Sequence, residues 1–179
     1  MLTVGGDKSA DRPISATEPD WSREAKGRFE WNPPRALLAA IRSYQRHASG
    51  GPLAGLARKL AVLRYRFWSA VTGADIPINA EIGGGLLIPH PNGIVIHANS
   101  VIGPNCIVFQ QVTLGLGHGG VPTLGGDVSI GAGAKLLGKI HVGDHAVVAA
   151  MAVVTTDVPA GKLAMGIPAR IMERQPKSE

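Results

Sequence analysis

The stretch LGGDVSIGAGAKLLGKIHVGDHAVVAAMAVV, residues 124–154, places an aliphatic residue at every sixth position. A second residue of inward-facing size follows most of these positions by four. A six-residue period is typical of a short strand and a turn, and three such hexads build one triangular coil. The same series also runs through the preceding sequence, and all thirteen members are Ile, Leu or Val: Ile76, Ile82, Ile88, Ile96, Ile102, Val108, Leu114, Leu124, Ile130, Leu136, Val142, Val148 and Val154. The sequence therefore predicts an all-β solenoid, a parallel β-helix of a little over four coils that ends in a turn at Asp157 and Pro159.

The period breaks twice, at residues 88–96 and 114–124, where the intervals are eight and ten residues. Extra residues have to leave a solenoid as loops, and loops on a rigid scaffold commonly carry function. Each loop contains a histidine, His90 in the first and His118 in the second. These two histidines are the first candidates for site residues.

The composition agrees with a narrow solenoid, because only 4% of the residues are aromatic and small aliphatic side chains have to fill the core. The single cysteine, Cys106, excludes a disulfide framework and a Cys-based zinc site. It follows Ile102 by four, so we expect it to be a buried apolar residue and not a nucleophile. No apolar stretch approaches 18 residues, and the first residues lack the layout of a signal peptide. We therefore expect a cytoplasmic protein without a membrane-spanning helix.

The net charge of +5 comes from one segment. Residues 35–72 contain seven Arg and Lys and no acidic residue. Such a segment is most simply a pair of solvated helical faces, and otherwise a surface for anionic lipid or an acidic partner. No nucleic-acid motif accompanies it, so no nucleic-acid partner is expected.

Four segments follow from these patterns. Residues 1–33 are polar and are expected to form a mobile tail. Residues 34–72 are expected to form a basic helical hairpin, with helices over about 35–47 and 53–71 and Pro34 in the first turn. Residues 73–171 form the β-helix, and residues 172–179 form a C-terminal tail.

The β-helix segment resembles the hexapeptide-repeat acyltransferases, most closely the serine O-acetyltransferases and the related exopolysaccharide and capsule acetyltransferases. The resemblance covers over half of the chain and rests on DIPINAEIG at 75–83, HPNGIVI at 90–96, QVTLG at 111–115, IGAGAKLLG at 130–138 and GIPAR at 166–170. It implies a left-handed β-helix, a homotrimer, and acetyl-CoA as co-substrate in the groove between adjacent prisms.

The resemblance also implies roles for individual residues. His90 matches the general base that deprotonates the acceptor hydroxyl, and Asp75 matches the carboxylate that orients it. Attack on the thioester would be direct, without an acyl-enzyme. Ala132 and Ala150 match residues that line the pantetheine arm, and Arg170 matches a contact to the CoA phosphates.

The chain departs from the serine-specific pattern in its second loop. Gly120 and Val121 stand where the serine enzymes have an Arg-His pair, so His118 is the remaining candidate for the second histidine. The acceptor is therefore L-serine, in cysteine biosynthesis, or a sugar hydroxyl of an exopolysaccharide or capsule. For a sugar acceptor, a membrane surface is a possible partner through residues 35–72. The alternatives are a catalytically impaired β-helix that binds acyl-CoA or acts as a scaffold, and a zinc enzyme like the gamma-class carbonic anhydrases. No metal is expected.

Overall fold

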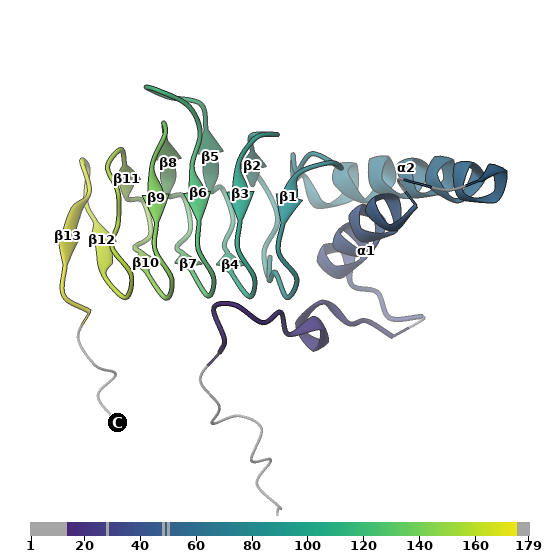
Figure 1. Ribbon diagram of the computed structural model, residues 1–179, viewed down its shortest axis with the longest axis horizontal. Helices are drawn as coiled ribbons and strands as arrows, with labels where there is room; N and C mark the ends of the chain where they lie inside the picture. Colours follow the sequence, from purple (N-terminus) through teal and green to yellow (C-terminus); the bar gives the residue numbers. More distant parts are fainter. Residues whose placement is uncertain (1–13, 28, 48, 50, 175–179) are drawn as a thin grey trace, which may run out of the picture.

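The computed structural model describes residues 14–27, 29–47, 49 and 51–174. Two helices, α1 (Pro33–Arg46) and α2 (Pro52–Thr72), form a hairpin that precedes a stack of short strands (Figure 1). The Asn32 side chain caps α1 by accepting a hydrogen bond from the amide of Arg35, and α2 ends at Gly73 in the left-handed region. The predicted helical hairpin is confirmed, with bounds one or two residues from the expected ones.

The strands build the three faces of a solenoid, and most of them are only two residues long. Sheet A has the order β11-β8-β5-β2, sheet B β1-β3-β6-β9, and sheet C β13-β12-β10-β7-β4. Every pair is parallel except β12 with β13. The strands are β1 (Glu81–Ile82), β2 (Val95–Ile96), β3 (Val101–Ile102), β4 (Ile107–Val108), β5 (Thr113–Gly115), β6 (Thr123–Leu124), β7 (Ser129–Ile130), β8 (Lys135–Leu137), β9 (His141–Val142), β10 (Val147–Val148), β11 (Val153–Val154), β12 (Leu163–Met165) and β13 (Arg170–Met172).

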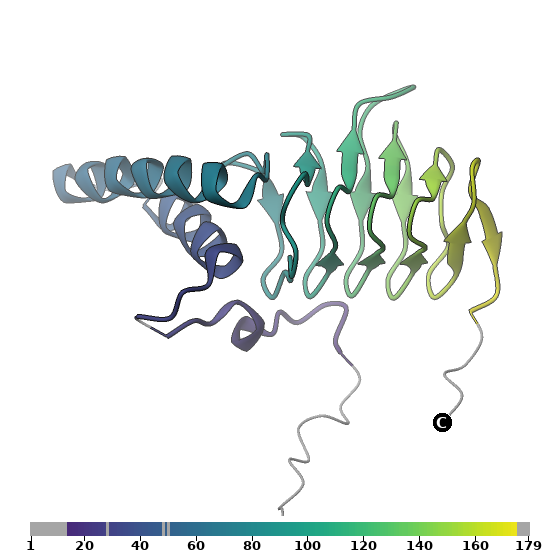
Figure 2. The same ribbon diagram turned by 180° about the vertical axis from the view of Figure 1, so that it is seen from behind.

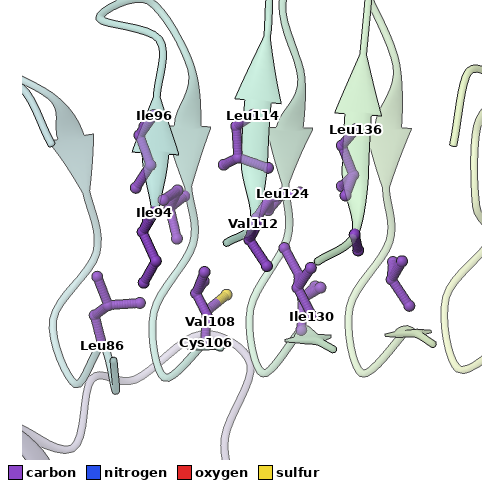
Figure 3. Close-up of a cluster of buried hydrophobic side chains, with 14 of the residues drawn as sticks. Leu86, Ile94, Ile96, Cys106, Val108, Val112, Leu114, Leu124, Ile130 and Leu136 are labelled. Atoms are coloured by element: carbon purple, nitrogen blue, oxygen red, sulfur yellow. The ribbon is translucent and has the colours of Figure 1, made fainter. Parts of the chain in front are cut away.

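The core is the row of aliphatic residues that the sequence predicts. In sheet A, Ile96 pairs with Leu114, Leu114 with Leu136, and Leu136 with Val154, so the hexad positions stack directly. All thirteen positions of the series are buried. Figure 3 shows six of these side chains inside the prism: Ile96, Val108, Leu114, Leu124, Ile130 and Leu136. The predicted parallel β-helix is confirmed.

Three edges join the faces, and two of them contain an inserted loop. Edge CA, between sheets C and A, contains the first loop, and edge AB contains the second loop, which projects furthest from the solenoid (Figure 1). All three edges contain residues with positive φ. These residues are Gly93, Gln111, Gly133 and Met151 on edge CA, Gly119, Gly120 and Gly138 on edge AB, and Gly85, Asn105, Asp127, His145 and Gly161 on edge BC. Gly, Asn and Asp tolerate this conformation best, which explains their frequency in the repeat.

The solenoid continues past the exit turn expected at Asp157 and Pro159. Val158 forms an isolated parallel bridge with Val142, and β12 pairs with β10 one coil further on. The solenoid therefore has more coils than the little over four that the sequence predicts. The last coil is shorter than three hexads, so the six-residue period does not reveal it. Strand β13 then turns back antiparallel to β12 and covers the end of sheet C.

Residues 14–24, which we call the strap, lie along edge BC (Figures 1 and 2). The side chain of Asn105 accepts a hydrogen bond of 2.7 Å from the amide of Asp20 and donates to the carbonyls of Ser15 and Glu18. The strap ends in a short 3-10 helix, Trp21–Glu24. The sequence predicts a mobile tail over residues 1–33, and in the structure the strap is hydrogen-bonded to the solenoid. Residues 1–13 lie outside the described residues.

A partly buried ion pair joins the strap to the hairpin. Arg42 of α1 contacts Glu24 at 2.8 Å and also donates to the carbonyls of Ile82 and Gly83 in the first coil. The carboxylate of Glu24 in turn accepts a hydrogen bond from the amide of Leu86. The pair therefore joins the strap, α1 and the first coil.

Candidate functional site

The first loop lies on edge CA, next to the end of α2. The amide of Gly93 donates to the carbonyl of Gly73 at 2.8 Å, and the amide of Gln111 donates to the carbonyl of Asn92 at 2.9 Å. The loop is therefore held between α2 and the next coil, and it exposes His90 to solvent.

Asp75 lies on the first rung of sheet A, beside the same edge. Its amide donates to the carbonyl of Ile94 at 2.8 Å, and its carbonyl accepts from the amide of Ile96 at 2.9 Å. Asp75 and the loop of His90 thus occupy neighbouring rungs at one end of the prism. Burial raises the pKa of Tyr65 on α2, and the negative charge of Asp75 adds to that increase, so a tyrosine also lies near this carboxylate.

The residues matched to CoA binding follow the same edge in order. The amide of Gly133 donates to the carbonyl of Gln110, and the amide of Met151 donates to the carbonyl of Ala132, both at 2.8 Å. Ala132 and Ala150 therefore lie on successive rungs beyond the first loop. With about 4.8 Å between rungs, Ala150 lies roughly 14 Å along the edge from Asn92.

Arg170 lies at the far end of this edge. The amide of Val153 in β11 donates to the carbonyl of Gly166, and the amide of Ala169 donates to the carbonyl of Val153. Arg170 follows directly and is exposed. The chain thus brings His90, Ala132, Ala150 and Arg170 to one edge, with the histidine and the arginine at opposite ends.

His118 lies on a different edge. Gly117 and Gly120 form an antiparallel bridge, and the carbonyl of His118 accepts a hydrogen bond of 3.1 Å from the amide of Lys139 on the next coil. These contacts hold the second loop at edge AB. The strands of sheet A run from edge CA to edge AB, so the two edges are about four residues, or roughly 13 Å, apart along the strand direction. Within one chain, the structure does not bring His118 together with His90.

The structure places two polar residues on edge CA that the sequence pattern does not predict, Gln110 and Lys135. The side-chain carbonyl oxygen of Gln110 is buried without a hydrogen-bond partner, between the rungs of Asn92 and Ala132. The ammonium of Lys135 donates to the carbonyl of Gln111 and to the hydroxyl of Thr113. Neither residue belongs to the aliphatic series, and only the stacking of the coils shows that they border this edge.

The remaining candidates have structural environments. Cys106 is fully buried, and burial raises the pKa of its thiol to about 12, as expected for a core residue. His145 is exposed and pairs with Asp127 at 3.0 Å, while His141 is exposed on sheet B. Within the described ranges, no three His, Cys, Asp or Glu side chains are grouped so that they could hold a metal ion. No helix among the described residues combines the length and apolar character needed to cross a membrane.

Comparison with known proteins finds serine acetyltransferases among the similar sequences and structures. The serine acetyltransferase of Synechococcus elongatus is 40% identical over 109 residues, which are 58% of this chain and 44% of that protein. The serine acetyltransferase of Haemophilus influenzae is 37% identical over 150 residues, 80% of this chain and 56% of the relative. The solved structure of Neisseria gonorrhoeae serine acetyltransferase in complex with serine superposes with a TM-score of 0.66 at 34% identity, covering 78% of this chain and 57% of that one. No family model matches the chain.

The fold and these relatives agree on one class. They support a hexapeptide-repeat acyltransferase family for this chain, and its solenoid matches the left-handed β-helix of the serine acetyltransferase structures. Within the class it is close to the serine O-acetyltransferases. The chain spans about half the length of the curated relatives that it matches.

Proposed function

We propose that the protein is an O-acetyltransferase that uses acetyl-CoA as co-substrate and His90 as general base. The observation that carries this proposal is the order of residues on edge CA. His90 lies at one end, Ala132 and Ala150 follow on later rungs, and exposed Arg170 lies at the other end. An extended pantetheine arm along this edge would bring its thioester to the histidine and its phosphates to the arginine.

The chemistry needs a base near the acceptor hydroxyl. An alcohol is a weak nucleophile at neutral pH, and a neutral imidazole can take its proton while the oxygen attacks the thioester carbonyl. The tetrahedral intermediate then expels the CoA thiolate, which takes up the proton from the imidazolium. Asp75, on the neighbouring rung, is proposed to hold the imidazole in the productive orientation.

We propose L-serine as the first acceptor to test, because the relatives and the superposed structure are serine acetyltransferases. A sugar hydroxyl is the second candidate. It is favoured by the second loop, where Gly120 and Val121 stand in place of the Arg-His pair that the resemblance implies for a serine site. Acetyl-CoA is a metabolite of the cytoplasm, so the proposal also assigns the enzyme to that compartment.

We further propose a homotrimer in which edge AB of one chain faces edge CA of the next. This arrangement follows from the separation of the two histidines, because His118 lies a sheet's width from His90 within one chain. In the trimer, His118 of the partner subunit would complete the site. A sample that elutes with the mass of a monomer and is fully active would contradict this arrangement.

The decisive experiment is the release of CoA from acetyl-CoA, measured with L-serine and with a panel of sugars and nucleotide sugars. His90→Ala should lower turnover by about 100-fold, the usual contribution of a general base. His141→Ala is the matched control, because that histidine is exposed on another face, and it should leave turnover unchanged. Tight binding of acetyl-CoA without turnover on any acceptor would favour the non-catalytic alternative.

A second experiment tests the shared site. His90→Ala and His118→Ala chains are mixed, unfolded together and refolded into mixed trimers. If each site combines His90 of one chain with His118 of another, some sites regain both histidines and activity returns to part of the wild-type level. Activity that stays at the level of the separate variants, with mixed trimers confirmed by mass spectrometry, would contradict the shared site.

A further inference from the structure

Helix α2 exposes a continuous apolar stripe. Its members are spaced alternately by three and four residues, and most of each side chain is in contact with solvent: Leu53 (85% exposed), Leu56 (68%), Leu60 (56%), Leu63 (66%) and Phe67 (55%). The opposite face is buried, as Ala61 and Thr72 show. A stripe of this length on a helix is well beyond the isolated apolar residues that protein surfaces commonly carry.

Cations flank the stripe on both sides. At 100° per residue, Lys59 and Arg66 lie along one border of the stripe, and Arg64 lies along the other. All three are exposed, and neither α1 nor α2 contains an acidic residue. The ion pair of Arg42 with Glu24 joins α1 to the strap, so Glu24 does not neutralise these cations.

The stripe ends in an aromatic cluster. The ring of Trp68 packs edge-on against Phe67 at 4.9 Å and against Trp31 at 5.4 Å, measured between ring centroids. Trp31 is 74% exposed. Leucine and phenylalanine on the apolar face, with Lys and Arg at its borders, are the composition of helices that lie in a membrane interface.

We propose that α2 binds the surface of an anionic lipid bilayer, with the stripe in contact with the acyl chains and Lys59, Arg64 and Arg66 at the headgroups. The positive charge along both borders of the stripe favours a lipid surface over a second copy of the helix. Packing two copies of the stripe together would bring rows of like charges into contact without an acid to pair them, whereas anionic headgroups neutralise both borders. The contact would be interfacial, since α2 is too polar to span the membrane.

The position of α2 is compatible with such a surface. Its outer part extends beyond the first coil, away from the solenoid, in both views of the chain (Figures 1 and 2). The candidate site on edge CA is beyond the other end of the helix. The inference is independent of the acceptor, because it uses no residue of that site.

Vesicle co-sedimentation of the full chain tests the proposal, with vesicles of phosphatidylcholine alone and of phosphatidylcholine with 30% phosphatidylglycerol. We expect binding only to the anionic vesicles, and weaker binding as salt is added. Lys59→Gln/Arg64→Gln/Arg66→Gln should weaken it by at least about tenfold. The matched control Lys26→Gln/Lys139→Gln/Arg174→Gln removes the same charge outside the hairpin and should stay within about twofold of the wild type.

A second pair of variants tests the apolar contact. Leu60→Gln/Leu63→Gln should also weaken binding by about tenfold, and Ile14→Gln/Met172→Gln, at similarly exposed positions, should not. Circular dichroism and light scattering check that fold and mass are unchanged. The proposal is overturned if anionic vesicles do not bind the wild type at low salt, or if both charge variants lose binding equally. It is also overturned if Leu60→Gln/Leu63→Gln changes the number of subunits, because the stripe is then an interface between copies.

Discussion

The amide of Gly93 donates a hydrogen bond of 2.8 Å to the carbonyl of Gly73, and this contact joins the first loop to the end of α2. Gly73 has a φ of +64°, and a Cβ built there would lie 2.7 Å from the side-chain nitrogen of Asn92. A side chain at residue 73 would therefore meet the end of the Asn92 side chain, in the loop that carries His90.

Gly73→Ala should therefore lower turnover by up to about tenfold, because the added methyl group displaces the side chain of Asn92 in the loop that carries His90. It should also lower the free energy of unfolding by about 1 kcal/mol through its left-handed backbone. Gly161→Ala is the control, since Gly161 has a φ of +71° and no atom within 4 Å of its Cβ position. Steady-state kinetics and urea denaturation should show the same stability loss in both variants and a turnover loss only in Gly73→Ala.

Ala150→Glu should raise the KM for acetyl-CoA by about tenfold, because it adds bulk and a negative charge to the edge proposed for the pantetheine arm and phosphates. The side chain of Ala150 is exposed, so folding should not change. Ala160→Glu makes the same change at an exposed position on edge BC. An equal rise in KM for both variants would show that net charge, and not the edge, controls the affinity.

Asn105→Gly should lower the free energy of unfolding by about 2–3 kcal/mol, since three hydrogen bonds to the strap are lost. Glycine accepts the φ of +61° at this position, so the turn itself is preserved. Asn99→Gly, at an exposed position, is the control. Limited proteolysis should cleave the strap faster in Asn105→Gly, and an unchanged cleavage rate would mean that other contacts hold the strap.

Cys106 should make the stability of the protein fall at high pH. Burial raises the pKa of its thiol from 9.0 to about 12, so below pH 9 the thiol is protonated in both the folded and the unfolded chain. Between pH 9 and 12 only the unfolded chain loses the proton, which favours unfolding. In urea denaturation, the stability advantage of the wild type over Cys106→Ala should therefore shrink from pH 8 to pH 10.5. A constant difference would show that the thiol titrates alike in both states.

Much of the fold can be read from the local spacing of residues. The hexads predict the solenoid because each coil repeats the same inward positions. Leu124, Ile130 and Leu136 are three such positions in succession, and all three are buried. The breaks at residues 88–96 and 114–124 predict the two loops for the same reason. The helices follow from Pro34 in the first turn of α1 and from the apolar spacing within the two segments.

Other features depend on contacts between distant residues, which a spacing pattern does not contain. The strap is polar and has no period, and it is held by Asn105, some 85 to 90 positions further along the chain. The six-residue period does not predict the last coil. Fewer residues separate β12 from its partner β10 than separate paired strands in the earlier coils.

The sequence by itself determined the solenoid, its core and the loops that carry His90 and His118, because these depend on the period of the chain. Only the tertiary structure decided which residues share an edge. His90, Ala132 and Ala150 come together through hydrogen bonds between coils, while the same stacking assigns His118 to the other side of sheet A. The physical reason is that each coil turns through three faces, so the face on which an inserted loop emerges, and not its distance along the chain, determines its neighbours.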